Sequence, residues 1–189
     1  MNLSTLARPA LALAVGVGLL GLAAPAASAH GDDDASTAST RLNYHERKVV
    51  KKATRALRTP AAAVAAGFQP TDECAELPGV GGMGYHYVNL DNLLDGVIDP
   101  RRPEVLVFVP TGDGGRKLGA VEYFQVDADQ DVTTDDDRPS LFGKYAFDGP
   151  MLGHGPGQPI HYDKHVWLYK HNPAGQLQPW NPKVHCPSV

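Results

Sequence analysis

The sequence predicts an α+β domain in which one or two N-terminal helices pack on an antiparallel sheet of four or five strands. Apolar residues with helical spacing occur before Gly67, whereas short β-forming runs separated by glycine and proline follow Cys74. An Asp-Gly-Gly sequence at 113–115 lies between two of these runs and indicates a hairpin, which favours antiparallel pairing.

Two helices are expected at the start of this domain. Asn43 stands three residues before Glu46, as in a capping box, and the apolar residues after it keep helical spacing over 43–58. A Thr-Pro pair then starts a second, short helix over 60–66, and Gly67 is typical of the residue that ends one.

Four runs of β-forming residues are expected to be strands, at 84–89, 104–109, 118–126 and 160–171. Residues 105–109 are apolar at every position, so this strand should be central in the sheet and covered on both faces. The Asp-, Gly- and Pro-rich stretches between the runs are expected to be loops.

Residues 1–29 have the pattern of a cleavable signal peptide. Arg8 precedes an apolar run shorter than the ~20 residues of a membrane span, and small residues lead to a cleavage site after Ala29. We therefore expect a secreted or periplasmic protein without a stable membrane anchor. Residues 30–41 should be a flexible tail, followed by a single globular domain at 42–189.

The charge and the cysteines narrow the range of partners and of compartments. The chain has 17 basic and 21 acidic residues and no basic stripe, which argues against nucleic acid as a partner. Its two cysteines, Cys74 and Cys186, predict one disulfide in an oxidising compartment. A metal site at these cysteines is the weaker alternative, because they lack close C-x-x-C spacing.

The segment 153–167 is the richest candidate for chemistry. In a strand, His161, Asp163 and His165 point to the same side, and two imidazoles beside a carboxylate suit a transition metal. His86 lies between two tyrosines in another strand. The alternation of residues 118–126 places Glu122 on the apolar side with Leu118, Ala120 and Phe124, where a carboxylate needs a partner.

These positions together predict a metal site. Its expected ligands are His86, Glu122, His161 and His165, with Asp163 as a further ligand or as a group that orients a histidine ring. Zinc or copper is the expected ion. A separate copper site would use the new N-terminus at His30.

Two other functions stay open. In the first, the histidines are structural hydrogen-bonding groups, and the aromatic residues line a pocket for a small molecule or a protein partner. In the second, the same residues carry acid/base or metal-assisted catalysis. We lean against an enzyme, because no nucleophile elbow or phosphate loop occurs and serine is scarce after residue 40.

From about Gly67 to Cys186 the sequence resembles a group of exported bacterial proteins to which no activity is assigned. The resemblance is carried by six motifs: Ala-Gly-Phe at 66–68, Gly-Met-Gly-Tyr-His-Tyr-Val-Asn at 82–89, Val-Glu-Tyr-Phe at 121–124, Phe-Asp-Gly-Pro-Met at 147–151, His-Tyr-Asp-Lys-His-Val-Trp-Leu at 161–168 and Trp-Asn-Pro at 180–182. Lys164 stands where such proteins are expected to have an apolar residue. The resemblance implies export and one domain, and it implies no reaction or ligand.

Overall fold

The structure is a computed structural model that describes residues 40–155 and 157–187. The signal peptide, nearly all of the expected tail and the copper site at His30 lie outside the described residues. Within the described ranges, no helix is long and apolar enough to cross a membrane.

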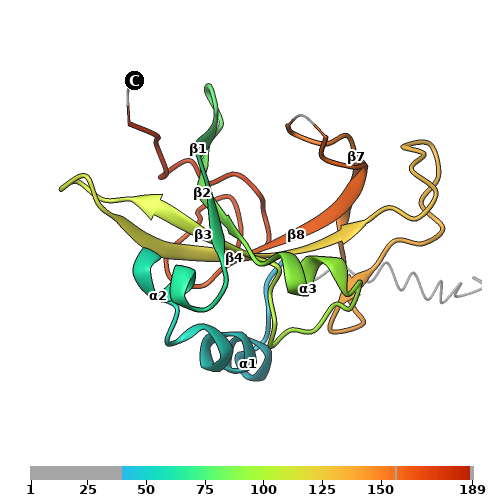
Figure 1. Ribbon diagram of the computed structural model, residues 1–189, viewed down its shortest axis with the longest axis horizontal. Helices are drawn as coiled ribbons and strands as arrows, with labels where there is room; N and C mark the ends of the chain where they lie inside the picture. The colour runs from blue at the N-terminus through green and yellow to red at the C-terminus, as the bar shows by residue number, and fades with distance from the viewer. Residues whose placement is uncertain (1–39, 156, 188–189) are drawn as a thin grey trace, which may run out of the picture. The chain divides into compact units, whose positions relative to one another are not determined.

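Six antiparallel strands form one curled sheet in the order β1-β2-β3-β4-β8-β7 (Figure 1). These strands are β1 (Gln69–Leu77), β2 (Gly81–Val88), β3 (Val105–Pro110), β4 (Arg116–Val126), β7 (Asp148–Met151) and β8 (His161–Trp167). A separate two-stranded sheet is formed by β5 (Ser140–Leu141) and β6 (Tyr145–Ala146). The architecture is therefore α+β, but the expectation of four or five strands is wrong.

The two strands of the large sheet that were not expected, β1 and β7, are its edge strands. β1 is rich in polar residues and mostly exposed, so it shows no apolar alternation, and β7 is a four-residue Asp-Gly-Pro-Met segment. Short, polar or proline-containing strands are typical of sheet edges, where one side of the strand makes no ladder hydrogen bonds. The strand expected at 160–171 ends earlier, at Trp167.

The expected helices both occur, and a third is added. α1 (Tyr44–Thr54) begins with the capping box, in which the Glu46 amide donates to Asn43 Oδ1 at 3.0 Å and the Asn43 amide donates to Glu46 Oε2 at 2.8 Å. It ends four residues earlier than expected, at a turn. α2 (Pro60–Ala65) has the Thr-Pro start, and α3 (Leu90–Leu94) is a short helix capped by Asn89.

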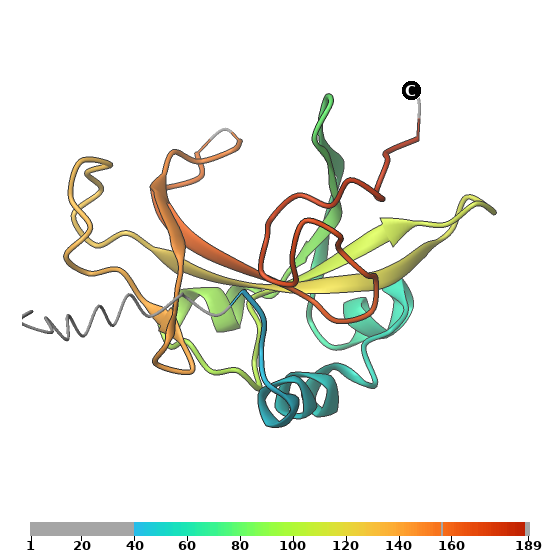
Figure 2. The ribbon, with the colours of Figure 1, turned by 180° about the vertical axis from the view of Figure 1, so that it is seen from behind.

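The two faces of the sheet are covered by different parts of the chain. α1 and α2 cover one face, and the C-terminal segment after β8, residues 168–187, lies on the other (Figures 1 and 2). Leu106 and Phe108 pack toward the helices, whereas Val107 and Val109 pack with Trp167 and Val184 on the opposite face. All five residues of 105–109 are at most 3% exposed, which confirms the central strand.

The 113–115 hairpin joins β3 to β4, and a β-bulge follows it at Gly119. Val107 pairs with Ala120 but Phe108 pairs with Leu118, so β4 has one extra residue at this point. A bulge changes the side to which the preceding residues point. Leu118 consequently packs on the helix side, and the expectation that it shares a face with Glu122 is wrong.

The Cys74–Cys186 disulfide is confirmed, and it attaches the C-terminal segment to β1. The same segment is held by two backbone hydrogen bonds between Gly82 and Asn181. Lys164, which stands at an expected apolar position, is 6% exposed and forms an ion pair with Asp148 of the neighbouring β7, at 2.9 Å. This partner accounts for a buried lysine at this position.

Candidate metal centre

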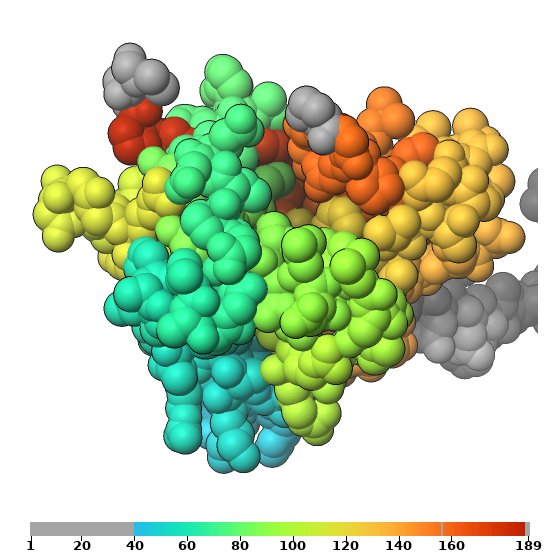
Figure 3. All heavy atoms as spheres, in the orientation of Figure 1, coloured from blue at the N-terminus to red at the C-terminus, as the bar shows by residue number. Residues whose placement is uncertain are grey.

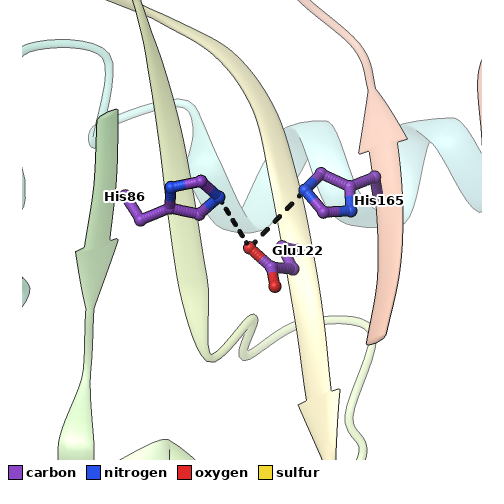
Figure 4. Close-up of side chains that lie close together, drawn as sticks. All are labelled: His86, Glu122 and His165. Atoms are coloured by element: carbon purple, nitrogen blue, oxygen red, sulfur yellow. Dashed lines mark ion pairs between the residues drawn. The ribbon is translucent and has the colours of Figure 1, made fainter. Parts of the chain in front are cut away.

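Three strands bring a histidine, a glutamate and a second histidine to the same side of the sheet (Figure 4). His86 comes from β2, Glu122 from β4 and His165 from β8. Glu122 and His165 are direct cross-strand partners, and His86 reaches Glu122 across β3. This is the face opposite α1 and α2.

The distances within this group suit a metal ion. Oε2 of Glu122 lies 3.4 Å from Nε2 of His86 and 3.6 Å from Nε2 of His165. One candidate ligand atom from each residue lies within 4.8 Å of the other two. Ligand atoms ~2.0–2.1 Å from a tetrahedral zinc ion are ~3.3 Å apart, so only small side-chain movements separate this arrangement from coordination.

The group is buried and lacks hydrogen-bond partners. His165 is fully buried, Glu122 is 6% exposed, and the His86 side chain is 19% exposed. Among the described residues, no hydrogen-bond partner reaches either ring nitrogen of His165 or Oε2 of Glu122. Buried polar atoms are nearly always satisfied, and Oε2 of Glu122 and Nε2 of His165 face each other at 3.6 Å, so one shared partner would satisfy both.

The electrostatics favour a positive charge at the same point. Burial and the neighbouring His165 lower the pKa of His86 to about 3, so its ring is neutral. Burial raises the pKa of Glu122 to about 7. Burial alone would lower the pKa of His165, but Glu122 and Asp163 together raise it to about 9. Glu122 and Asp163 thus favour a positive charge between them. Without a metal ion, protonation of His165 provides this charge.

Asp163 lies behind His165 rather than among the three ligand candidates. It is 2% exposed, and its Oδ1 is 3.7 Å from Nδ1 of His165, on the ring edge away from Glu122. A carboxylate in this position can fix the orientation and the tautomer of a ligating imidazole. Of the two roles expected for Asp163, its position fits the orienting one.

The structure does not bring His161 into the group. Its ring stacks on Phe124 with centroids 4.4 Å apart, and its Nδ1 lies 3.0 Å from the carbonyl oxygen of Pro159. Residues four apart in a strand are ~13 Å apart along the chain, whereas in a helix they are neighbours. His161 and His165 therefore cannot both reach the same ion from β8.

A pocket of about 670 Å³ opens directly onto the candidate ligands. Figure 3 shows the hollow between β1, α3 and the loop that precedes β8. His86, Glu122 and Asp163 line it, while His165 lies on the buried side of the group. A metal held here would face the pocket.

Several pocket residues were not among the expected site residues. Leu90 and Leu93 belong to α3, whose cap at Asn89 and apolar spacing were available in the sequence but fell at the end of a strand run. His154 lies in the Gly-rich loop next to the expected site, and no pattern distinguished it from other loop residues. Trp180 is brought in by the C-terminal segment.

The described residues contain no second group of three histidine, cysteine or acidic side chains with this proximity. In comparisons with known proteins, no protein-family model, no curated protein and no solved structure matches the chain.

Proposed function

We propose that this protein is exported and binds a zinc or copper ion through His86, Glu122 and His165. The observation that carries the proposal is the set of buried, unpartnered ligand atoms at the meeting point of three strands. An ion would satisfy Oε2 of Glu122 and Nε2 of His165 together, and Asp163 would hold the His165 ring. Two imidazoles and one carboxylate are a donor set that these ions accept.

Export is supported by two independent features. The disulfide is typical of proteins that fold in an oxidising compartment. The sequence of residues 1–29 is typical of a signal peptide.

Metal analysis of the exported protein tests the proposal. We expect about one equivalent of zinc or copper in protein purified without a histidine tag, since the site offers one group of ligands. Glu122→Gln keeps the side-chain shape but removes the anionic ligand, and His86→Ala removes a ligand that is half-buried. Both variants should lose the metal, whereas the exposed His171→Ala should keep it.

Circular dichroism of each variant supplies the control for folding. If the wild-type protein holds no metal after reloading at neutral pH, or if Glu122→Gln and His86→Ala hold as much as His171→Ala, this assignment is wrong. The pocket would then stand as a site for a ligand that needs no ion.

Replacing Asp163 with asparagine should weaken metal binding without removing a ligand. The amide cannot attract the Nδ1–H of His165 as a carboxylate does, so the ring is less firmly oriented and less basic. Loss of such an orienting group typically lowers metal affinity about 10- to 100-fold. Competition with a chromophoric chelator measures the change, and an affinity equal to that of the wild type would show that Asp163 does not support the site.

A further inference from the structure

We infer that the pocket binds a small molecule with an elongated apolar body and one anionic oxygen head group, which coordinates the metal. This inference rests on the proposed metal site and names the class of ligand that reaches it. It follows from the direction in which the site opens, the composition of the pocket walls and the charges that the walls lack.

The site opens toward the pocket. Zinc with three protein ligands keeps a fourth position for water or another ligand. His165 is fully buried behind the group, whereas His86 and Glu122 both line the cavity, so the fourth position points into it. Any molecule that enters the pocket with an oxygen donor at its leading end meets the ion.

The walls are mainly apolar, and their apolar residues come from three parts of the fold. The sheet contributes Met83, Val88, Val105 and Phe124, α3 contributes Leu90 and Leu93, and the C-terminal segment contributes Trp180. A volume of about 670 Å³ lies within the range of pockets that enclose drug-sized ligands. Such walls recover free energy from a hydrocarbon chain and none from a sugar or another polar body.

The charges in the pocket restrict the head group. Among the described residues that line it there is no lysine or arginine, whereas Glu73, Glu122 and Asp163 are acidic. Among the described lining residues, no lysine or arginine therefore offers a ligand a positive charge besides the ion. A head group with one negative charge can bind the ion directly as its fourth ligand, while a phosphate-rich ligand would leave further negative charges uncompensated next to acidic side chains.

The mouth of the pocket continues this apolar surface. Leu90 lines the pocket and is nevertheless 57% exposed. A ligand whose hydrocarbon chain is longer than the cavity would therefore contact Leu90 at the mouth. Leu93 lines the pocket, whereas its neighbour Leu94 is 76% exposed and does not, so these two leucines of α3 provide a matched pair of positions for a test.

The test uses protein loaded with Co²⁺, whose visible bands report both loading and a change of ligand. A series of straight-chain hydroxamates from acetohydroxamate to octanohydroxamate supplies a constant oxygen head group and an increasing apolar body. Affinity should increase about two- to fourfold for each added methylene group until the pocket is filled. In Leu93→Ser this dependence on chain length should weaken, while acetohydroxamate binds as before, and Leu94→Ser should behave like the wild type.

The outcomes separate the two proposals. Absence of the cobalt bands in the wild-type protein would overturn the metal site and, with it, this inference. Cobalt bands combined with equal affinities for short and long hydroxamates would overturn the inference alone. Equal effects of Leu93→Ser and Leu94→Ser would also overturn it, because the contact would then not be with the pocket wall.

Discussion

Replacing Cys74 and Cys186 with serine is expected to lower the free energy of unfolding by about 3–5 kcal/mol. The disulfide joins residues 112 positions apart, so it closes one long loop that contains β2 to β8. A cross-link of this length acts mainly on the unfolded chain, whose conformational freedom it restricts. The variant should therefore unfold at a much lower urea concentration, with a larger dependence on urea because its unfolded state is more expanded.

The folded state should lose little when the bond is removed. Gly82 and Asn181 still exchange two backbone hydrogen bonds, and Val184, 2% exposed, still packs on Trp167 and Val109. The metal site should accordingly remain loaded in the double variant under native conditions. Its ligands come from β2, β4 and β8, none of which carries a cysteine.

Reductant provides the matched control for this measurement. Wild-type protein unfolded in the presence of dithiothreitol should match the serine variant, and the variant itself should not respond to the reductant. A loss of less than about 1 kcal/mol would show that the unfolded chain is already restricted, which would overturn the entropic explanation.

Elements that depend on neighbouring residues in the chain could be predicted from the sequence, whereas the two edge strands of the sheet could not. The capping box at Asn43, the all-apolar strand at 105–109 and the Asp-Gly-Gly hairpin each depend on neighbouring residues. β1 and β7 depend on the rest of the sheet, which supplies their hydrogen-bonding partners. Residues of such edge strands have no reason to alternate between apolar and polar.

The candidate site shows the same division. Side-chain alternation placed Asp163 and His165 on the same side of their strand, as they are in β8, since this parity is set within one strand. The order of strands decided the rest, because β8 lies beside β4 and so joins His165 to Glu122. His161 was expected at the site because alternation puts it on the same side of the strand as His165, but four residues of extended backbone separate the two rings by ~13 Å.

A buried carboxylate outside the site, that of Glu104, is expected to contribute to the dependence of stability on pH. Glu104 is 1% exposed, and its Oε2 accepts a hydrogen bond from the Phe124 amide at 3.1 Å. No ion pair reaches it in the part of the chain that the structure describes. Burial raises the pKa of this carboxyl to about 8, although its backbone hydrogen bonds oppose the change.

The sign of the effect follows from where the proton is held. Between about pH 4.5 and pH 8 the folded protein keeps the proton on Glu104 while the unfolded chain releases it, so stability falls as pH increases through this range. Above about pH 8 the folded protein carries the buried negative charge of Glu104, and the full destabilisation is reached. The difference between the two pKa values sets a ceiling of roughly 5 kcal/mol, which relaxation of the folded protein around the charge will reduce.

Glu104→Gln should therefore make the protein more stable at alkaline pH, by about 1–3 kcal/mol at about pH 9, and should change it little at about pH 5. The glutamine oxygen can still accept from the Phe124 amide, and the side chain never ionises. Urea unfolding of metal-free protein across this pH range measures the difference, with the exposed Glu73→Gln as the control for loss of one negative charge.

Because Glu122 and His165 also titrate in this range, only the difference between variant and wild type isolates Glu104. Parallel pH profiles for Glu104→Gln and the wild type would mean that the folded protein ionises Glu104 at no cost, and a gain in Glu73→Gln as well would assign the effect to net charge.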